Sequence, residues 1–316
     1  MKSYFLAVIL VLTMTTTACA SQPLTVLLDW FVNPDHAPLI IAKSDGIFDS
    51  YDLSVNLVEP ADPNVPPKLV AAGQALIAIS YQPQLHMQVD QGLPLVRFGT
   101  IVATPLNSLV VLRDGPIQSL ADLNGRKIGY SIGGFEEAIL GTMLKTANVS
   151  INNVELINVN FSLSPALISG QVDAVIGAFR NFELNQLDII GESGKAYYPE
   201  EYGVPTYDEL IFITHRDRVN DLRLKPFLLA IEQAVQTIQN HPDETWNTFK
   251  AYKAGLDDDL NRRAWRDTLP RFALRPGAQD SERYNRFANF LVASGLIKSN
   301  QGVDAYTIEL SAAKSK

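Results

Sequence analysis

The stretch KLVAAGQALIAIS, residues 68 to 80, indicates the fold class of this 316-residue chain. The end of an apolar helix leads through Gly73 into a short buried strand, Ile77–Ile79. Gly73 stands where a helix C-terminus favours a positive φ. The stretch PALISGQVDAVIG, residues 165 to 177, repeats this order, with Gly170 at the same place. Two copies of one helix–strand unit predict two similar α/β halves.

Strands and helices alternate along the rest of the chain, which favours α/β sheets. The other expected strands are Leu24–Leu28, Leu53–Leu57, Leu95–Val102, Leu109–Leu112, Lys127–Ser131, Val154–Val159, Ala174–Ile176 and Leu210–Thr214. The expected helices are His36–Lys43, Asn64–Ala72, Ser119–Leu123, Phe135–Ala147 and Pro226–Gln239, with several more between Pro242 and Ile297. We therefore expect an α/β protein of two lobes, with a ligand cleft between them.

The expected lobes divide the chain into four segments. Residues 1–20 form a signal peptide, residues 21–108 the first part of lobe 1, residues 109–212 lobe 2, and residues 213–316 the return to lobe 1 with the C-terminal helices. About 295 residues remain after the signal peptide, and chains of that size usually split into two domains.

The N-terminus is typical of a secretory signal, with Lys2 before an apolar stretch, Tyr4–Leu12, that is too short to span a bilayer. Ala18-Cys19-Ala20 predicts cleavage before Ser21. Thr17-Ala18-Cys19 also resembles the end of a lipoprotein signal, which would anchor the protein through Cys19. Either alternative predicts a periplasmic or extracytoplasmic protein. No later segment is long and apolar enough to cross a membrane.

Composition excludes several other classes of function. Cys19 is the single cysteine, so neither a disulfide framework nor a thiolate metal cluster is expected. The net charge of −8 excludes nucleic acid as a partner, because nucleic-acid binding needs a basic face. The four histidines are scattered without a metal-binding spacing. We expect a monomer without a metal or cofactor.

Polar and aromatic residues follow four strands, at Asp29–His36, Ser80–Gln84, Ser131–Glu137 and Phe179–Glu183. The first lies in LLDWFVNPDHAP, residues 27 to 38. Two prolines stiffen its turn and limit its conformations. Trp30 is either a core aromatic or a stacking surface, and Asn33 and His36 either cap the next helix or contact a ligand.

SIGGFEEA, residues 131 to 138, carries Gly133, Gly134, Phe135, Glu136 and Glu137 through a glycine turn into a helix start. Such a turn is an anion site by default, but two glutamates in the first helical turn would repel a phosphate. The glutamates either complement the helix dipole or accept hydrogen bonds from a ligand amine.

AFRNFEL, residues 178 to 184, places Phe179, Arg180, Asn181 and Glu183 after the second repeat strand, and Tyr81 and Gln82 follow the first. Aromatic faces beside hydrogen-bonding groups suit a planar heteroaromatic ligand. None of these groupings forms a catalytic triad, a glycosidase acid pair or a metal hydrolase site.

Several motifs resemble a known family. SLAD followed by LNGRKIGYS, with SGQVDA and the signal peptide, resembles the solute-binding proteins of ABC importers. D-W-F-x-N-P-D-H-A-P, with LVEPADPN, SIGGFEEA and GAFRNFEL, is similar to the thiamine-precursor group of that class. This group contains formylaminopyrimidine-binding receptors and the yeast-type hydroxymethylpyrimidine phosphate synthases. The resemblance covers roughly residues 24 to 250.

The resemblance implies a type II periplasmic-binding-protein fold with a pyrimidine held between the lobes and no catalytic residue. The matching positions are Trp30, Asn33, His36, Tyr81, Gly133 to Glu137, and Arg180 to Glu183. It also implies a membrane permease as partner and uptake of the pyrimidine for thiamine biosynthesis. Two departures stand out: Leu76 replaces an acid that usually follows Gly-Gln-x, and the cysteine-rich motif of the yeast-type enzymes is absent.

The alternatives are a receptor for riboflavin or another planar heterocycle, and a receptor for a sulfonate or nitrate, which two glutamates disfavour. The remaining alternative is a synthase that consumes a histidine and needs iron, with His36 as the candidate. The missing cysteines and the signal peptide argue against the synthase.

Overall fold

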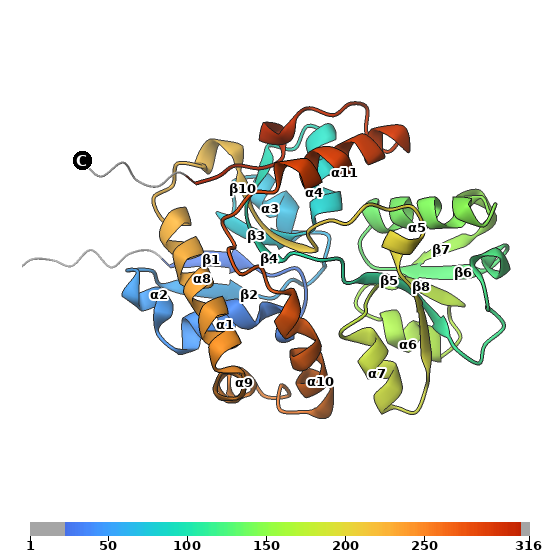
Figure 1. The fold of residues 1–316 in the computed structure, drawn as a ribbon, viewed down its shortest axis with the longest axis horizontal. Helices are drawn as coiled ribbons and strands as arrows, with labels where there is room; N and C mark the ends of the chain where they lie inside the picture. Colours follow the sequence, from blue (N-terminus) through green and yellow to red (C-terminus); the bar gives the residue numbers. More distant parts are fainter. Residues whose placement is uncertain (1–22, 311–316) are drawn as a thin grey trace, which may run out of the picture.

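The computed structural model describes residues 23–310. The expected signal peptide, its cleavage site and Cys19 lie outside these residues. The described chain forms two lobes side by side, each built on one five-stranded sheet (Figure 1). Within residues 23–310 every helix is too short or too polar to cross a membrane.

The first lobe holds a sheet in the order β2-β1-β3-β10-β4. These strands are β1 (Leu24–Leu27), β2 (Val55–Val58), β3 (Ile77–Ser80), β4 (Leu95–Val102) and β10 (Leu210–His215). β1, β2 and β3 run parallel, whereas β10 returns from the second lobe and inserts antiparallel between β3 and β4. A late strand thus completes the middle of an early sheet.

Helices cover both faces of this first sheet. One face packs against α1 (Ala37–Ser44), α2 (Ile47–Ser50), α8 (Leu224–Asn240) and α9 (Pro242–Ala251). The other face packs against α3 (Pro66–Ala71), α4 (Gln82–Asp90) and α11 (Ser281–Ala293). In β10, Phe212 joins the first layer while Ile211 and Ile213 join the second, as the alternation of strand side chains requires.

The second lobe repeats the same strand order as β7-β6-β8-β5-β9. Its strands are β5 (Asn107–Leu112), β6 (Lys127–Tyr130), β7 (Glu155–Asn158), β8 (Ala174–Phe179) and β9 (Gly194–Tyr197). One face carries α5 (Phe135–Thr146), and the other carries α6 (Leu163–Ile168) and α7 (Glu183–Ile189). Here β5 is the strand that lies antiparallel in the sheet.

The two repeat units lie one in each sheet, as α3–β3 and α6–β8. Gly73 and Gly170 have φ values of 72° and 70°, the left-handed conformation expected for residues that end helices. The chain crosses between the sheets at residues 103–106 and again at 198–209. The expected lobe limits, after residues 108 and 212, therefore fall inside β5 and β10.

The remaining elements are short or bridge the lobes. α10 (Asp259–Thr268) contacts α7 of the second lobe, although it follows the return of the chain to the first (Figure 1). The 3-10 turns within residues 23–310 are η1 (Pro34–His36), η2 (Leu120–Leu123), η3 (Ile151–Asn153), η4 (Pro199–Glu201), η5 (Arg216–Arg218), η6 (Leu269–Arg271) and η7 (Val303–Ala305). The expected tail helices correspond to α9, α10 and α11.

Candidate functional site

A cavity between the two sheets is lined by both lobes. Its atom-free space is about 440 Å³, which includes the part that opens to solvent. The first lobe contributes Asp29, Trp30, Asn33, Asp35, His36, Tyr81 and Leu210. The second contributes Ser131, Ile132, Leu163, Gly177, Phe179, Phe182 and two glutamates, Glu136 and Glu183. Among the described residues, the lining contains four carboxyl groups and neither Lys nor Arg.

Asp29 organises the wall that the first lobe provides. It is the second residue after β1 and is almost fully buried. Its Oδ2 accepts a hydrogen bond from the Tyr81 hydroxyl at 2.8 Å, and its Oδ1 lies 3.0 Å from His36 Nε2. One carboxyl group therefore ties the ends of two neighbouring strands, β1 and β3, to the turn that follows.

His36 uses both of its ring nitrogens within the chain. The Asn33 backbone N–H donates to His36 Nδ1 at 3.2 Å, so Nε2 carries the hydrogen and donates to Asp29. Asn33 also caps η1, because its Oδ1 accepts from the Asp35 backbone N–H at 2.8 Å. Pro34 follows as the first residue of η1, where its fixed φ suits a helix start. This local capping holds the His36 ring in place.

Tyr81 of the first lobe contacts two aromatic rings of the second lobe. Its ring stacks on Phe135 with centroids 5.2 Å apart and planes 28° apart, and it meets the edge of Phe179 at 6.4 Å. Burial, followed by the nearby Asp29 carboxyl, raises the pKa of the Tyr81 hydroxyl well above its usual value. The hydroxyl therefore stays protonated and acts as a donor.

Glu136 is the main acid on the wall that the second lobe provides. It is the second residue of α5, and its Oε2 accepts from the backbone N–H groups of Ser131 at 2.8 Å and Ile132 at 3.1 Å. Burial raises the pKa of Glu136 to about 8, more than these bonds lower it. Gly177 in β8 makes room for it, because a Cβ there would lie 2.4 Å from Glu136 Oε1.

Glu183 is the first residue of α7 and also accepts from the backbone of the preceding turn. Its Oε2 accepts from the Phe179 backbone N–H at 2.7 Å, and burial raises the pKa of Glu183 to about 8. A carboxyl that keeps its proton both donates and accepts a hydrogen bond. That pair of functions matches a ring nitrogen beside an exocyclic amine.

Asp35 is the fourth buried acid of the lining, and it contacts the second lobe. Its Oδ1 accepts from Asn181 Nδ2 at 2.6 Å and lies 3.0 Å from Thr268 Oγ1. Its Oδ2 has no hydrogen-bond partner among the described residues. Burial raises the pKa of Asp35 to about 6, against the lowering effect of His36.

Aromatic side chains meet across the cleft beside this cavity. Trp30, which lines the cavity, contacts the edge of Phe161 with ring centroids 4.6 Å apart. Phe31 lies 4.4 Å from the same Phe161 ring and is 46% exposed. Phe161 belongs to the segment between β7 and α6 of the second lobe. These ring contacts therefore join the two lobes next to Trp30.

The family model described as NMT1/THI5 like matches residues 33–245, about two thirds of the chain. The chain belongs to the NMT1/THI5-like family. The lining residues from Asn33 to Leu210 all fall within the matched range. Asp29 and Trp30 also line the cavity and lie just before that range.

Relatives of this NMT1/THI5-like chain include binding proteins and enzymes. A Haemophilus influenzae protein that carries the provisional name thiamine biosynthesis protein is 50% identical over 300 residues, or 95% of this chain and 96% of that one. The formylaminopyrimidine-binding protein of Halalkalibacterium halodurans is 34% identical, over 73% of this chain and 70% of that one. The 4-amino-5-hydroxymethyl-2-methylpyrimidine phosphate synthase of Legionella pneumophila is 25% identical, over 79% of each.

Solved structures share the fold of this NMT1/THI5-like chain. A Candida albicans protein described as having the generic periplasmic binding protein fold matches with a TM-score of 0.74 and 17% identity, over 93% of this chain and 99% of that one. The alkanesulfonate-binding protein of Xanthomonas axonopodis matches with a TM-score of 0.70 and 15% identity, over 90% and 98%. The expected two-lobed type II periplasmic-binding-protein fold is confirmed.

The structure brings seven of the residues predicted from sequence into the cavity lining. They are Trp30, Asn33, His36, Tyr81, Glu136, Phe179 and Glu183. Phe135 stacks on Tyr81 but lines a different pocket. Asn181 reaches the cavity only through its bond to Asp35. All nine belong to the four predicted segments that follow strands β1, β3, β6 and β8.

The other predicted residues lie outside the cavity. The Gly133 backbone N–H donates to Asn64 Oδ1 of the first lobe, and the Gly134 N–H donates to Glu137 Oε2 at 3.3 Å. Gly134 has a φ of 92°, and Glu137 completes the helix cap rather than reaching inward. The glycine turn thus starts α5 and connects the two lobes, and its two glycines do not line the cavity.

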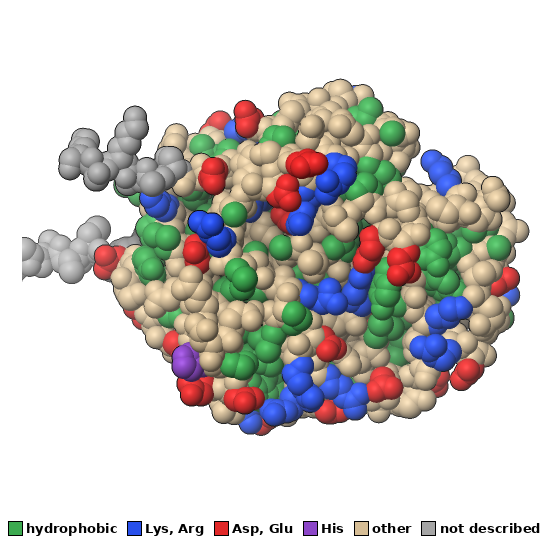
Figure 2. Space-filling model, in the orientation of Figure 1, with side chains coloured by type: hydrophobic (Ala, Val, Ile, Leu, Met, Phe, Trp, Pro, Cys, Tyr) green, Lys and Arg blue, Asp and Glu red, His purple; other side chains and the backbone are tan. Residues whose placement is uncertain are grey.

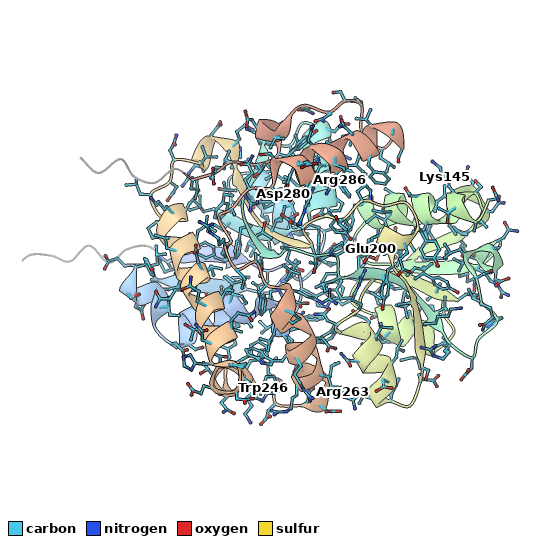
Figure 3. All side chains as sticks on the ribbon, viewed as in Figure 1. Lys145, Glu200, Trp246, Arg263, Asp280 and Arg286 are labelled. Atoms are coloured by element: carbon cyan, nitrogen blue, oxygen red, sulfur yellow. The ribbon has the colours of Figure 1, made fainter. Side chains whose placement is uncertain are left out.

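Arg180 turns away from the cavity toward the crossing segments. Its guanidinium pairs with Glu200 at 2.5 Å and donates to the carbonyl oxygens of Leu106 and Asn107. It also lies 4.0 Å from the centre of the Tyr198 ring. Glu200 is located at the junction of the lobes (Figure 3). Arg180 therefore braces the two crossings between the sheets.

Sequence reasoning missed Asp29, Asp35, Gly177 and Phe161 as site residues. Asp29 and Asp35 stand inside the quoted stretch LLDWFVNPDHAP, next to Trp30 and His36, so their position was a signal. Gly177 ends the quoted repeat, but the need for it depends on Glu136. Within residues 23–310 there is no grouping of three or more His, Cys, Asp or Glu side chains suited to a metal ion.

Proposed function

We propose that this chain is the extracytoplasmic solute-binding component of an ABC importer and that it binds a thiamine-precursor pyrimidine between its lobes. The observation that carries this proposal is a cavity with aromatic rings and four carboxyl groups, to which both lobes contribute. A membrane permease is the expected partner. The 34% identity to a formylaminopyrimidine-binding protein supports the ligand class.

An aminopyrimidine matches the side chains of the cavity lining in aromatic contacts and in hydrogen bonding. A flat ring fits beside Tyr81, Phe179 and Trp30, where stacked or edge contacts contribute about 0.5–1.5 kcal/mol each. A protonated Glu136 or Glu183 donates to a ring nitrogen and accepts from the neighbouring amine. An ionised carboxylate instead accepts from the amine and from a protonated ring.

Anionic ligands fit this cavity poorly. A sulfonate, nitrate or phosphate needs donors or positive charge, and the lining provides four acids with neither Lys nor Arg. The likeness to an alkanesulfonate-binding protein, at 15% identity, concerns the fold and not the ligand. The binding function is also favoured over a synthase, because His36 is held at both ring nitrogens and is not presented as a reacting group.

The test is native mass spectrometry of the purified protein, followed by calorimetric titration with a panel of ligands. The panel contains formylaminopyrimidine, 4-amino-5-hydroxymethyl-2-methylpyrimidine, thiamine, riboflavin and an alkanesulfonate. We expect the first two to bind at least tenfold more tightly than the others, unchanged after incubation. Tightest binding of riboflavin would transfer the proposal to that ligand class, and turnover of a bound pyrimidine would favour the synthase alternative.

The extracytoplasmic location has its own measurement. The N-terminal mass of the exported protein separates the two processing routes, since cleavage before Ser21 leaves an unmodified serine. Lipid attachment would instead leave a modified Cys19 at the N-terminus. Retention of the intact N-terminus inside the cell would contradict an importer component.

A further inference from the structure

Three buried polar side chains meet where the lobes touch. Asp35 comes from η1 of the first lobe, Asn181 from the turn after β8 of the second lobe, and Thr268 from the last turn of α10. Their exposed fractions are 1%, 2% and 0%. The contact is therefore shielded from water, where hydrogen bonds are stronger than on the surface.

The bonds among these three groups share a limited number of hydrogens. Asn181 Nδ2 donates to Asp35 Oδ1 at 2.6 Å and to Thr268 Oγ1 at 2.7 Å. Thr268 Oγ1 in turn lies 3.0 Å from Asp35 Oδ1 and 2.7 Å from the Ala264 carbonyl oxygen. Its single hydrogen serves one of these acceptors at a time. An ionised carboxylate is the stronger acceptor.

The two carboxyl oxygens of Asp35 differ in their bonding. Oδ1 makes the bonds to Asn181 and Thr268, whereas Oδ2 is buried without a hydrogen-bond partner in the described residues. Asp35 also lines the cavity, so Oδ2 is the oxygen left for a bound molecule. An unpaired buried acceptor costs free energy that a donor from the ligand recovers.

Neighbouring contacts support the same junction. Asn185 Nδ2 donates to Asp267 Oδ2 at 2.7 Å, and Arg263 of α10 pairs with Asp188 of α7 at 2.5 Å. Arg263 lies on the side of α10 that faces the second lobe (Figure 3). In Figure 2, basic and acidic side chains lie next to one another along the lower edge of the molecule. These outer pairs are partly exposed and contribute little free energy. The buried contact of Asp35, Asn181 and Thr268 therefore contributes most to this junction of the lobes.

We propose that Asp35 couples ligand binding to lobe closure, with Oδ1 holding the second lobe through Asn181 and Thr268 and Oδ2 accepting a hydrogen bond from a ligand N–H. The inference rests on the proposed function for its ligand class, an amino-substituted heterocycle. A donor at Oδ2 favours the ionised carboxyl, which then accepts more strongly at Oδ1. Occupancy of the cavity therefore tightens the closed arrangement.

The main test uses Thr268→Val, which removes the hydroxyl but leaves every cavity-lining residue in place. Thr245→Val is the matched control, because Thr245 is also a buried helical threonine, 2% exposed, whose hydroxyl donates to a carbonyl four residues earlier. Both full-length variants and the unaltered protein are titrated with 4-amino-5-hydroxymethyl-2-methylpyrimidine. Small-angle X-ray scattering of each, with and without this pyrimidine, gives the radius of gyration.

We expect Thr268→Val to weaken pyrimidine binding roughly 3- to 10-fold, the scale of one hydrogen bond, and to enlarge the ligand-free radius of gyration. Thr245→Val should match the unaltered protein in both measurements. Thermal unfolding of the two variants separates a loss of binding from a loss of stability, since both lose a comparable hydroxyl bond.

The second test asks whether the two oxygens of Asp35 act together. Asp35→Asn keeps the shape of the side chain but removes its charge, and we expect pyrimidine affinity to fall more than about tenfold. In that background Thr268→Val should cause little further loss, because coupled residues give non-additive effects. The analogue 5-hydroxymethyl-2-methylpyrimidine, which lacks the amine, should bind weakly and respond little to either change.

Equal affinity and equal scattering of Thr268→Val and Thr245→Val would overturn the coupling. Additive losses in the Asp35→Asn background would do the same. If the unaltered protein binds no pyrimidine, the proposed function fails on its own. The ligand-free scattering comparison still decides whether the Asp35 contact holds the lobes together.

Discussion

The two walls of the cavity differ in how their acids are bonded. On the first-lobe wall, Asp29 is bonded through both carboxyl oxygens to other side chains, those of His36 and Tyr81. On the second-lobe wall, Glu136 and Glu183 are bonded through one oxygen each to backbone N–H groups of their own turns. Asp29 therefore has both carboxyl oxygens bonded within the chain, whereas Glu136 and Glu183 each keep one carboxyl oxygen outside these bonds.

The two kinds of bonding have different consequences for ligand binding. Side chains bonded to one another are held in one orientation before a ligand arrives, which lowers the entropy that binding costs. Acids bonded only to backbone keep a proton and a free oxygen, which exchange with the hydrogen bonds of a ligand. We therefore expect changes at Asp29 to affect mainly folding, and changes at Glu136 and Glu183 to affect binding and the pH dependence of folding.

The pH dependence of folding tests the second wall with the largest expected effect. The pKa values of Glu136 and Glu183 are both raised to about 8 in the folded protein, above the ordinary value of 4.5. The folded state then holds protons that the unfolded state has lost, so stability falls as the pH rises from about 4.5 toward 8. Each such carboxyl contributes about 1.4 kcal/mol per pH unit, and urea unfolding from pH 5.5 to 8 should show a fall of several kcal/mol.

The matched variant for this prediction is Glu136→Gln with Glu183→Gln, which should flatten the pH profile. Two other buried acids remain in that variant: Asp35, and Glu209 at the end of the second crossing segment. Their pKa values are raised to about 6 and about 7, so they leave a residual slope of the same sign. A stability that rises between pH 5.5 and 8 would contradict the protonated second wall.

Asp29→Leu tests how much the hydrogen bonds of Asp29 stabilise the folded protein. It leaves the His36 ring N–H and the Tyr81 hydroxyl buried without an acceptor, which should cost roughly 2–4 kcal/mol of unfolding free energy. Asp29→Asn is the matched control, since it keeps one acceptor oxygen at nearly the same volume and should cost about half as much. Equal urea midpoints for both variants would mean that the network adds nothing to folding.

Glu136→Gln separates the second wall from the helix start beside it. The amide keeps an oxygen for the Ser131 and Ile132 N–H groups but cannot ionise, so pyrimidine affinity should fall by roughly 1.5–3 kcal/mol. Stability at neutral pH should rise, because the variant lacks the carboxyl that ionises in the unfolded state. Glu137→Gln is the control, because Glu137 caps α5 outside the cavity and should change binding less than twofold. Calorimetric titration measures both, and unchanged binding in Glu136→Gln would remove Glu136 from the site.

Trp30 gives the smallest expected effect, because its ring lies at the edge of the first wall against Phe161. Trp30→Ala should weaken a planar ligand by about 1 kcal/mol, whereas Trp30→Phe should keep much of the affinity. Ligand titrations beside urea unfolding separate stacking from packing. A large loss of stability with intact affinity would assign Trp30 to the core instead.

Most of the fold followed from local patterns, and the exceptions have local causes. α4 was not predicted as a helix, because Gln82, Gln84, His86 and Gln88 are buried where a periodic pattern would place apolar residues. His86 shows the result: burial lowers its pKa to about 3, and its ring packs 4.0 Å from that of Tyr306. α7 and β9 were also missed, since both are short.

The candidate site followed from sequence only as far as its four strand ends. Parallel strands bring their C-terminal ends to one edge of a sheet, so residues after β1, β3, β6 and β8 could be placed near one cleft. The direction of each side chain depended on partners elsewhere in the chain. Arg180 follows a strand as Phe179 does, yet it pairs with Glu200 at the crossing segments.

The sequence by itself determined the two α/β halves, the glycine-ended helices of the repeat and the capped turn that holds His36, because these depend on residues within a few positions of each other. Only the tertiary structure decided that Asp29 joins Tyr81, that Gly177 leaves space for Glu136, and that Asp35 meets Asn181 and Thr268. Those contacts connect residues 41 to 233 positions apart, and no local pattern records which distant side chain completes a buried hydrogen bond.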